Sequence, residues 1–257
     1  MILLDGKSLS AKILSDLKSK IVNCKQKINL DIVLVGDNPS SLKYISLKQK
    51  RASEIGIGGQ LYHLSDTISQ PKILELFNNL NEDTKITGYF IQLPIPNIQE
   101  TSLLLSKINT HKDADGLNPD SGITPAVVRG IISLLKHYQI SIDQKNIVIV
   151  NDSALIGQPL KKYFSDFTSQ IILLNDQTLD LISFTKKADI LISATGVKNL
   201  ITADMLKKGV VVVDVASGDV DFDSVSKIAS FITPTFGGVG PMTVASLLQN
   251  TYDLATK

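Results

Sequence analysis

The sequence predicts an α/β protein with two lobes, and three observations support this prediction. Segments with helical periodicity alternate with short apolar runs of strand length along the chain. A chain of 257 residues lies in the size range in which a hydrophobic core divides between two lobes. A polar, glycine-rich stretch at residues 111–122 interrupts the alternation and is expected to form the hinge between the lobes.

The first lobe is predicted from its elements in chain order. Residues 8–25 carry apolar side chains at helical spacing, and residues 31–35 follow as a short strand. Pro39 is expected to open a helix that ends at Gly56. Strands are then predicted around residues 60–63 and over residues 88–93, where a proline-rich break ends the second strand.

The second lobe repeats the alternation in the manner of a dinucleotide-binding, Rossmann-like domain. Strands are predicted at residues 146–150, 170–174, 189–194 and 210–215, with helix-sized segments between them. The last helix, residues 241–254, is expected to pack back on the first lobe. The first lobe then comprises residues 1–120 together with the C-terminal helix 240–257, and the second comprises residues 121–239.

Composition favours a small-molecule partner over a nucleic acid or a membrane. The formal net charge is +1, and no run of lysine and arginine is interleaved with aromatic residues. The most apolar runs are far shorter than a membrane span. The only cysteine, Cys24, excludes internal disulfides and a thiolate metal site. With an N-terminus that does not read as a signal peptide, this predicts a cytoplasmic protein.

Two segments of the first lobe carry candidate site residues. Ser41, Tyr44 and Lys48 are spaced by three and four, which places them on one helix face. A solvated face with a snorkelling lysine explains the same spacing. Gln92 ends an apolar strand, where ligands bind in open α/β sheets, although the local pattern favours a residue that caps backbone groups at a turn.

The segment HKDADGLNPDSG places two carboxylates, Asp113 and Asp115, before a glycine. A calcium loop, a plain turn and a substrate clamp are all compatible with it. The twelfth position counted from Asp113 is Thr124, which cannot supply the bidentate glutamate of an EF-hand loop. No metal site is therefore predicted.

Four strings in order, YISLKQK, IQLPIP, KDADG and GGVGPMT, resemble the bifunctional methylenetetrahydrofolate dehydrogenase/methenyltetrahydrofolate cyclohydrolase family across nearly the whole chain. The resemblance implies that Lys48 is the catalytic lysine, with Gln92 beside it, Tyr44 stacking on the folate and Asp115 binding the pterin. It also places Gly237, Gly238 and Pro241 beside the folate, although Phe236 replaces a usual proline. A homodimer formed through the second lobe is also implied.

The chemistry of these residue types agrees with the implied roles. A carboxylate such as Asp115 accepts paired hydrogen bonds from the amino-pyrimidinone edge of a pterin. A desolvated lysine beside a cationic methenyl carbon has a lowered pKa, so its neutral amine can accept a proton from the attacking water. Arginine could not do this, because it stays protonated.

The predicted cofactor site departs from the family pattern. In NDSALIGQP, Ser153 and Gly157 match the family's phosphate-binding turn, but Asn151 replaces a glycine and Asp152 replaces the arginine that meets the 2′-phosphate of NADP. Asp176 stands where the family has a serine after the next strand, and Thr195 and Gly196 still fit a close approach to a cofactor. Two acids favour NAD over NADP, unless both point into solvent.

A second departure follows Asp214, where the family's Gly-Ile-Asn segment is shortened to Ala216 and Ser217. The sequence therefore leaves several functions open. The chain is a bifunctional enzyme using NAD or NADP, a cyclohydrolase without productive hydride transfer, or a folate-binding protein without catalysis. An unrelated dehydrogenase would leave the first-lobe motifs unexplained.

Overall fold

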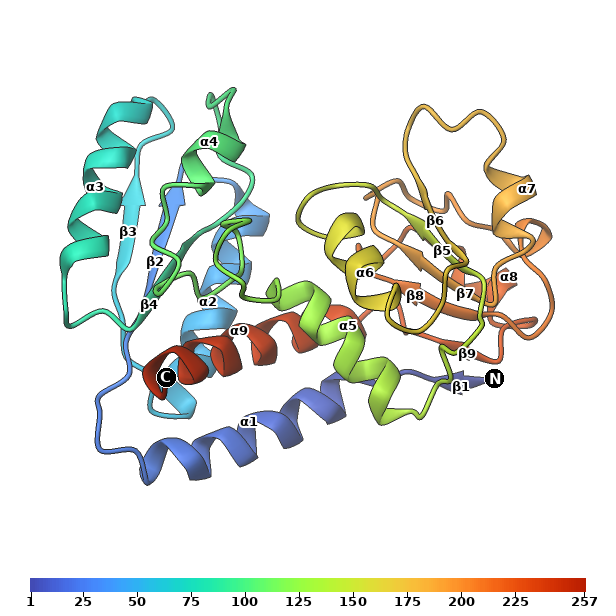
Figure 1. Cartoon of the computed structure of the whole chain (residues 1–257), viewed down its shortest axis with the longest axis horizontal. Helices are drawn as coiled ribbons and strands as arrows, with labels where there is room; N and C mark the ends of the chain where they lie inside the picture. Colours follow the sequence, from blue (N-terminus) through green and yellow to red (C-terminus); the bar gives the residue numbers. More distant parts are fainter. The chain divides into compact units, whose positions relative to one another are not determined.

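The computed structural model describes all 257 residues, which form two compact units. The first unit contains Met1–Ala11 and Val127–Thr243, and the second contains Lys12–Ala126 and Val244–Lys257. Each unit has its own sheet with parallel strands, so the predicted two-lobed α/β class is confirmed (Figure 1). The boundaries differ from the predicted ones at the N-terminus. Residues 1–11 belong to the unit that contains the Rossmann-like sheet, and not to the first lobe, because the strand at Ile2–Leu3 pairs with the strand at Phe231–Ile232.

The first unit has a six-stranded sheet in the order β1-β9-β8-β7-β5-β6. Its strands are β1 (Ile2–Leu3), β5 (Ile147–Val150), β6 (Ile171–Leu174), β7 (Ile190–Ser193), β8 (Val211–Asp214) and β9 (Phe231–Ile232). Its helices are α5 (Ala126–His137), which starts at the boundary, α6 (Gly157–Phe164), α7 (Leu181–Thr185), η1 (Ala203–Met205) and α8 (Phe222–Val225). Figure 1 shows α6 on one side of the sheet and α7 and α8 on the other.

The strand order of this sheet defines where a ligand can bind. The chain moves from β5 outward to β6 and then returns to β7 on the other side of β5. Strands β5, β7 and β8 are buried along their whole length, as the continuous runs of valine and isoleucine require. The carboxyl ends of β5 and β7 therefore form a topological switch point, the usual position of a ligand in such sheets.

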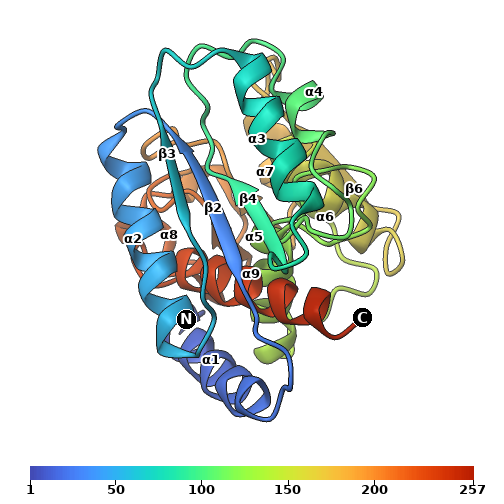
Figure 2. The same cartoon turned by 90° about the vertical axis from the view of Figure 1, so that its left-hand side faces the viewer.

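The second unit has a three-stranded parallel sheet in the order β3-β2-β4. Its strands are β2 (Leu30–Val35), β3 (Leu61–Leu64) and β4 (Gly88–Ile91), and its helices are α2 (Pro39–Glu54), α3 (Gln70–Glu82) and α4 (Thr101–Leu105). Figure 2 shows α2 and α3 on opposite sides of this sheet. Helices α1 (Gly6–Val22) and α9 (Val239–Ala255) each contribute residues to both units.

The C-terminal part of α9 packs inside the second unit, as predicted. The side-chain amide of Asn250 donates to the carbonyl of Thr124 at 3.1 Å. Gly88 at the start of β4 lies so close to Leu254 that a Cβ there would be 3.1 Å from its side chain. The end of the chain is therefore part of the core that supports β4.

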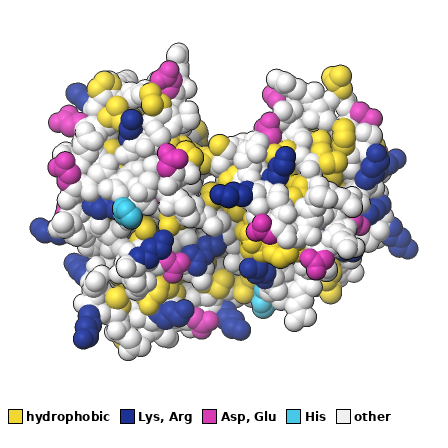
Figure 3. All heavy atoms as spheres, viewed as in Figure 1, with side chains coloured by type: hydrophobic (Ala, Val, Ile, Leu, Met, Phe, Trp, Pro, Cys, Tyr) yellow, Lys and Arg dark blue, Asp and Glu magenta, His cyan; other side chains and the backbone are white.

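The surface carries both signs of charge. On the face shown in Figure 3, lysine and arginine side chains are interspersed with aspartate and glutamate. No helix combines the length and the apolar character needed to cross a membrane. No group of three or more histidine, cysteine, aspartate or glutamate side chains is arranged to hold a metal ion.

Candidate active site

Helix α2 carries Lys48 into the core of the second unit. The helix begins at Pro39, and the side chain of Asn38 caps it by accepting from the backbone N–H of Ser41 at 3.0 Å. Ser41, Ile45, Lys48 and Ala52 form its buried stripe. Lys48 thus occupies a position where an apolar residue is expected, and it is 2% exposed.

Four side chains surround the ammonium group of Lys48. Its Nζ donates to Oε1 of Gln92 at 3.1 Å and lies 3.8 Å from Oδ2 of Asp115. The same nitrogen lies over the rings of Phe90 and Tyr44, at 4.1 Å and 4.8 Å from their centroids. The structure therefore brings together the four predicted catalytic residues and rules out the alternative of a solvated, snorkelling lysine.

Burial shifts the pKa values of the two charged groups toward their neutral forms. Desolvation lowers the pKa of Lys48, and the neighbouring Asp115 carboxylate opposes this shift. Burial raises the pKa of Asp115 to about 6, against the effect of Lys48. The separation of 3.8 Å between Nζ of Lys48 and Oδ2 of Asp115 is longer than a direct hydrogen bond, so the two groups form an ion pair without one.

The two carboxylates of the KDADG segment have different surroundings. Asp113 is fully buried and accepts from the backbone N–H groups of Leu117 and Asn118 at 3.0 and 2.8 Å. This carboxylate therefore fixes the loop. Asp115 has a side chain that is 17% exposed and that faces Lys48. Only the second carboxylate is available to a substrate.

Gln92 forms hydrogen bonds with both ends of its side-chain amide. Its Nε2 donates to the carbonyl of Leu93 at 2.8 Å, as a turn-capping residue does, while its Oε1 accepts from Lys48. Phe90 was not predicted as a site residue. It precedes Gln92 by two positions on β4, so strand alternation would have placed both side chains on one face.

In the first unit, a hollow lies at the carboxyl ends of β5, β6 and β7. Asn151, Asp152, Asp176 and Thr195, all predicted to bind a cofactor, contribute to its walls. Apolar side chains complete the lining, namely Val150, Leu174, Leu181, Val197 and Leu200. Asp152 accepts from the side-chain amide of Asn175 at 2.9 Å. Both acidic residues are exposed, yet both face the hollow at this end of the sheet.

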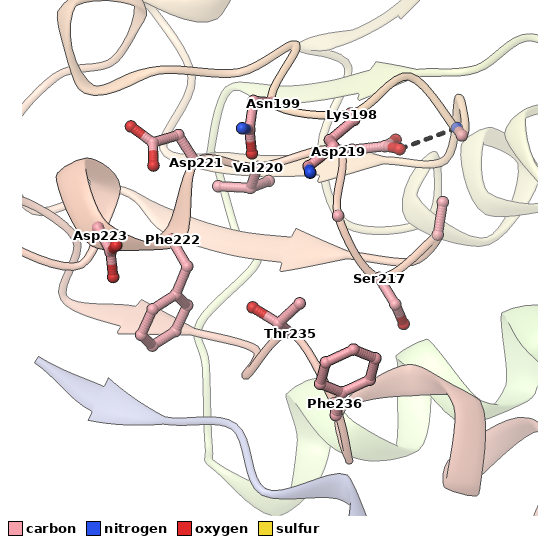
Figure 4. A pocket seen from close by; sticks show the side chains of 13 residues that line it. Lys198, Asn199, Ser217, Asp219, Val220, Asp221, Phe222, Asp223, Thr235 and Phe236 are labelled. Atoms are coloured by element: carbon pink, nitrogen blue, oxygen red, sulfur yellow. Dashed lines mark hydrogen bonds between the residues drawn. The ribbon is translucent and has the colours of Figure 1, made fainter.

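A second hollow is lined by Gly196, by residues 216–223 and by Thr235 and Phe236 (Figure 4). Asp219, which is fully buried, fixes the turn at residues 195–196 by accepting from the N–H groups of Thr195 and Gly196 at 2.6 and 2.8 Å. Ser217 of the short loop and the ring of Phe236, which is 85% exposed, flank the opening. Residues of this fixed turn thus line both hollows, Thr195 the first and Gly196 the second.

The remaining predicted residues belong to the first unit. The carbonyl of Gly237 accepts from the N–H of Lys7 at 2.8 Å, and Gly237 has a φ of 89° that favours glycine. A Cβ on Gly238 would lie 2.9 Å from the side chain of Thr233. Pro241 stands in the first turn of α9. Lys48 and its partners all belong to the second unit.

Comparisons with known families cover both units. Residues 4–115 match the model of the tetrahydrofolate dehydrogenase/cyclohydrolase catalytic domain. Residues 125–257 match the model of the NAD(P)-binding domain of the same enzymes. The two matches together span most of the chain.

Individual relatives are similar over their full length. The bifunctional protein FolD of Campylobacter jejuni is 41% identical over 277 aligned positions, which cover 99% of this chain and 98% of the relative. A crystal structure of the Campylobacter jejuni enzyme, a methylenetetrahydrofolate dehydrogenase/cyclohydrolase, has a TM-score of 0.94 and covers 100% of this chain and 99% of its own. The Trypanosoma brucei enzyme, solved with NADP and an inhibitor, is 26% identical with a TM-score of 0.94, and the match covers 100% and 97% of the two chains.

Proposed function

The chain belongs to the tetrahydrofolate dehydrogenase/cyclohydrolase family, and on this premise we propose that it oxidises methylenetetrahydrofolate to methenyltetrahydrofolate and hydrolyses the product to formyltetrahydrofolate. The observation that carries the proposal is Lys48, buried between Gln92, Asp115 and two aromatic rings. The test is to supply each folate separately, following reduced dinucleotide for the first step and loss of the methenyl compound for the second.

Hydrolysis needs a base and an electrophile that is already cationic. Water adds to the methenyl carbon, and the neutral amine of Lys48 accepts the proton that the water loses. The hydroxyl group of this adduct then loses its proton to form the formyl C=O as one of the two C–N bonds breaks, and the leaving nitrogen takes up a proton, so that one proton is released overall. Gln92 orients the amine through its 3.1 Å hydrogen bond. Desolvation lowers the pKa of Lys48, which favours the neutral amine that this step requires.

Folate binding is assigned to Tyr44 and Asp115. The carboxylate of Asp115 is the acceptor for the donor edge of the pterin, and the half-buried ring of Tyr44 offers a face for stacking. The geometry around Lys48 supports these two roles. Gly237, Gly238 and Pro241 are proposed to contribute to folate binding from the family resemblance alone.

The oxidation step requires a nicotinamide dinucleotide, which takes up the hydride from the methylene carbon. The residues of the first unit fit the adenosine end of such a molecule, because the hollow combines apolar walls with Asp152, Asp176 and Thr195. Ser153, Gly157 and Gly196 are the remaining residues proposed to contact it. The turn at residues 151–157, which would hold the phosphates, fits less well, because its donors already bond to the side chain of Asn151.

We expect NAD to be preferred to NADP. The carboxylates of Asp152 and Asp176 can accept from ribose hydroxyls, whereas a 2′-phosphate would meet two negative charges. Each exposed contact is worth about 1 kcal/mol, so the KM for NADP should exceed that for NAD by about fivefold or more. Initial rates of dinucleotide reduction at low salt measure both values.

The Asp152→Asn/Asp176→Asn double variant should lower the ratio of the KM for NADP to the KM for NAD. Added salt should lower the same ratio in the wild type, because it screens exposed charges. Asp166→Asn is the matched control, because Asp166 is an exposed aspartate of the same unit that does not line the hollow. A strong preference of the wild type for NADP would refute the charge argument.

Folate affinity should depend on pH through Asp115. The pKa of this group is raised to about 6, so its carboxylate is charged above that pH and protonated below it. Protonation removes the paired acceptor, and the Kd of tetrahydrofolate should therefore rise as the pH falls through about 6. Calorimetric titrations from about pH 5 to about pH 8, under reducing conditions, follow this change. A flat profile would mean that Asp115 does not bind the pterin.

A cyclohydrolase without productive hydride transfer remains the second candidate function. The short loop at Ala216 and Ser217 and the replaced residues of the phosphate turn favour it, since both lie in the first unit and leave the Lys48 centre complete. Dinucleotide reduction by the purified chain separates the two candidates. A homodimer is proposed from the family resemblance, and a cytoplasmic location from the single cysteine, which suits a reducing compartment.

A further inference from the structure

The side chain of Asn151 holds an unusual position at the switch point of the first unit. Asn151 follows β5, and its Nδ2 donates to the carbonyl of Ala194, which follows β7, at 2.8 Å. The carboxamide therefore connects the ends of the two strands between which a dinucleotide passes in a sheet of this order.

The oxygen of the same carboxamide takes up the donors of the turn. Oδ1 of Asn151 accepts from the backbone N–H of Ser153 at 2.9 Å, from the hydroxyl of Ser153 at 2.7 Å and from the N–H of Gly157 at 3.2 Å. Convergent N–H and O–H donors at a helix start are the groups that bind a phosphate oxygen. Here they surround a neutral oxygen of the chain itself.

The backbone N–H groups after Gly157 in the first turn of α6 are already bonded within the chain or missing. The N–H of Gln158 donates to the carbonyl of Ser153 at 3.0 Å, and that of Leu160 donates to the carbonyl of Ile156 at 3.0 Å. Pro159 has no N–H. A Cβ on Gly157 would lie 2.1 Å from the carbonyl oxygen of Asn151, so the turn is also closely packed.

We propose that Asn151 sets the affinity for the dinucleotide by occupying, with its carboxamide oxygen, the place of a phosphate oxygen at this turn. This inference rests on the proposed use of a dinucleotide. A phosphate oxygen can accept from these three donors only after it displaces the carboxamide, which exchanges three hydrogen bonds within the protein for bonds to the ligand. Asn151 thus acts as a built-in competitor of the ligand's diphosphate.

Binding of ADP-ribose, which carries the diphosphate without the nicotinamide, tests the proposal by calorimetry. Asn151→Gly and Asn151→Ala release the donors and should lower the Kd by about tenfold. Asn151→Asp keeps an acceptor in place but adds a negative charge, so its Kd should rise. A residue that only stabilises the turn would weaken binding in all three variants.

Asn146→Ala is the matched control. Asn146 directly precedes β5, at the end opposite to Asn151, and its side chain forms no hydrogen bond with the turn at residues 151–157. The Kd of this variant should equal that of the wild type. The proposal is overturned if the glycine and alanine variants bind ADP-ribose no more tightly than the wild type, or if the aspartate variant binds as tightly. Absence of any ADP-ribose binding even by the glycine variant, with methenyl hydrolysis intact in the wild type, would instead reject dinucleotide use.

Discussion

Replacing Lys48 by methionine is expected to abolish hydrolysis of methenyltetrahydrofolate, with a fall in kcat of about 10²- to 10⁴-fold. Methionine keeps the length and apolar stem of the side chain but has no amine to accept the proton of the attacking water. Because Lys48 is 2% exposed, an uncharged side chain of similar volume also avoids the desolvation of an ammonium group. The variant should therefore fold, which thermal unfolding can verify.

Two further variants define the role of Lys48. Lys48→Arg should not rescue the rate, because a guanidinium stays protonated and cannot act as a base. Lys50→Met, an exposed position on the same helix, should leave the rate unchanged. Near-normal hydrolysis by a folded Lys48→Met variant would remove Lys48 from the mechanism.

Asp115→Asn should raise the Kd of tetrahydrofolate by about tenfold to a hundredfold. An amide can accept only one of the paired hydrogen bonds of the pterin edge and turns a donor toward the other. Loss of the carboxylate also removes the group that opposes the lowering of the pKa of Lys48, so the amine remains available as a base. The effect should therefore appear mainly in Kd and KM rather than in kcat.

Calorimetric titration of the variant measures this change directly. Asp120→Asn provides the control, since Asp120 is an exposed aspartate in the same loop. An unchanged Kd for Asp115→Asn would assign the pterin to another acceptor. Asp113 is not suitable as a control, because its carboxylate holds the loop through two backbone bonds.

The sequence predicts the main elements of the fold because their periodicity is local. The strand predicted at residues 146–150 is β5, Ile147–Val150, and the helix opened by Pro39 ends at Glu54, two residues before the predicted glycine. Strands β1 and β9 were not predicted. Each has only two residues, too few for a periodic pattern. Strand β1 forms by pairing with β9, which lies more than 200 positions later in the chain, and β9 also pairs with β8.

The site was predictable in its residue types but not in its burial. The spacing of Ser41, Tyr44 and Lys48 is the same on a solvated face and on a buried one, and only β4, folded against α2, decides between them. For the same reason, the sequence names Asn151 as a cofactor contact but does not reveal that its oxygen accepts the donors of its own turn. Such bonds depend on the backbone path between β5 and α6.

The most direct test of the proposed function is the decay of methenyltetrahydrofolate in the presence of the purified wild-type chain without any dinucleotide. The proposed hydrolytic centre of Tyr44, Lys48, Gln92 and Asp115 lies entirely in the second unit and needs no cofactor. The expected result is a saturable decay well above the rate in buffer alone. Decay at the buffer rate, with a folded protein that still binds tetrahydrofolate, would contradict the proposed function.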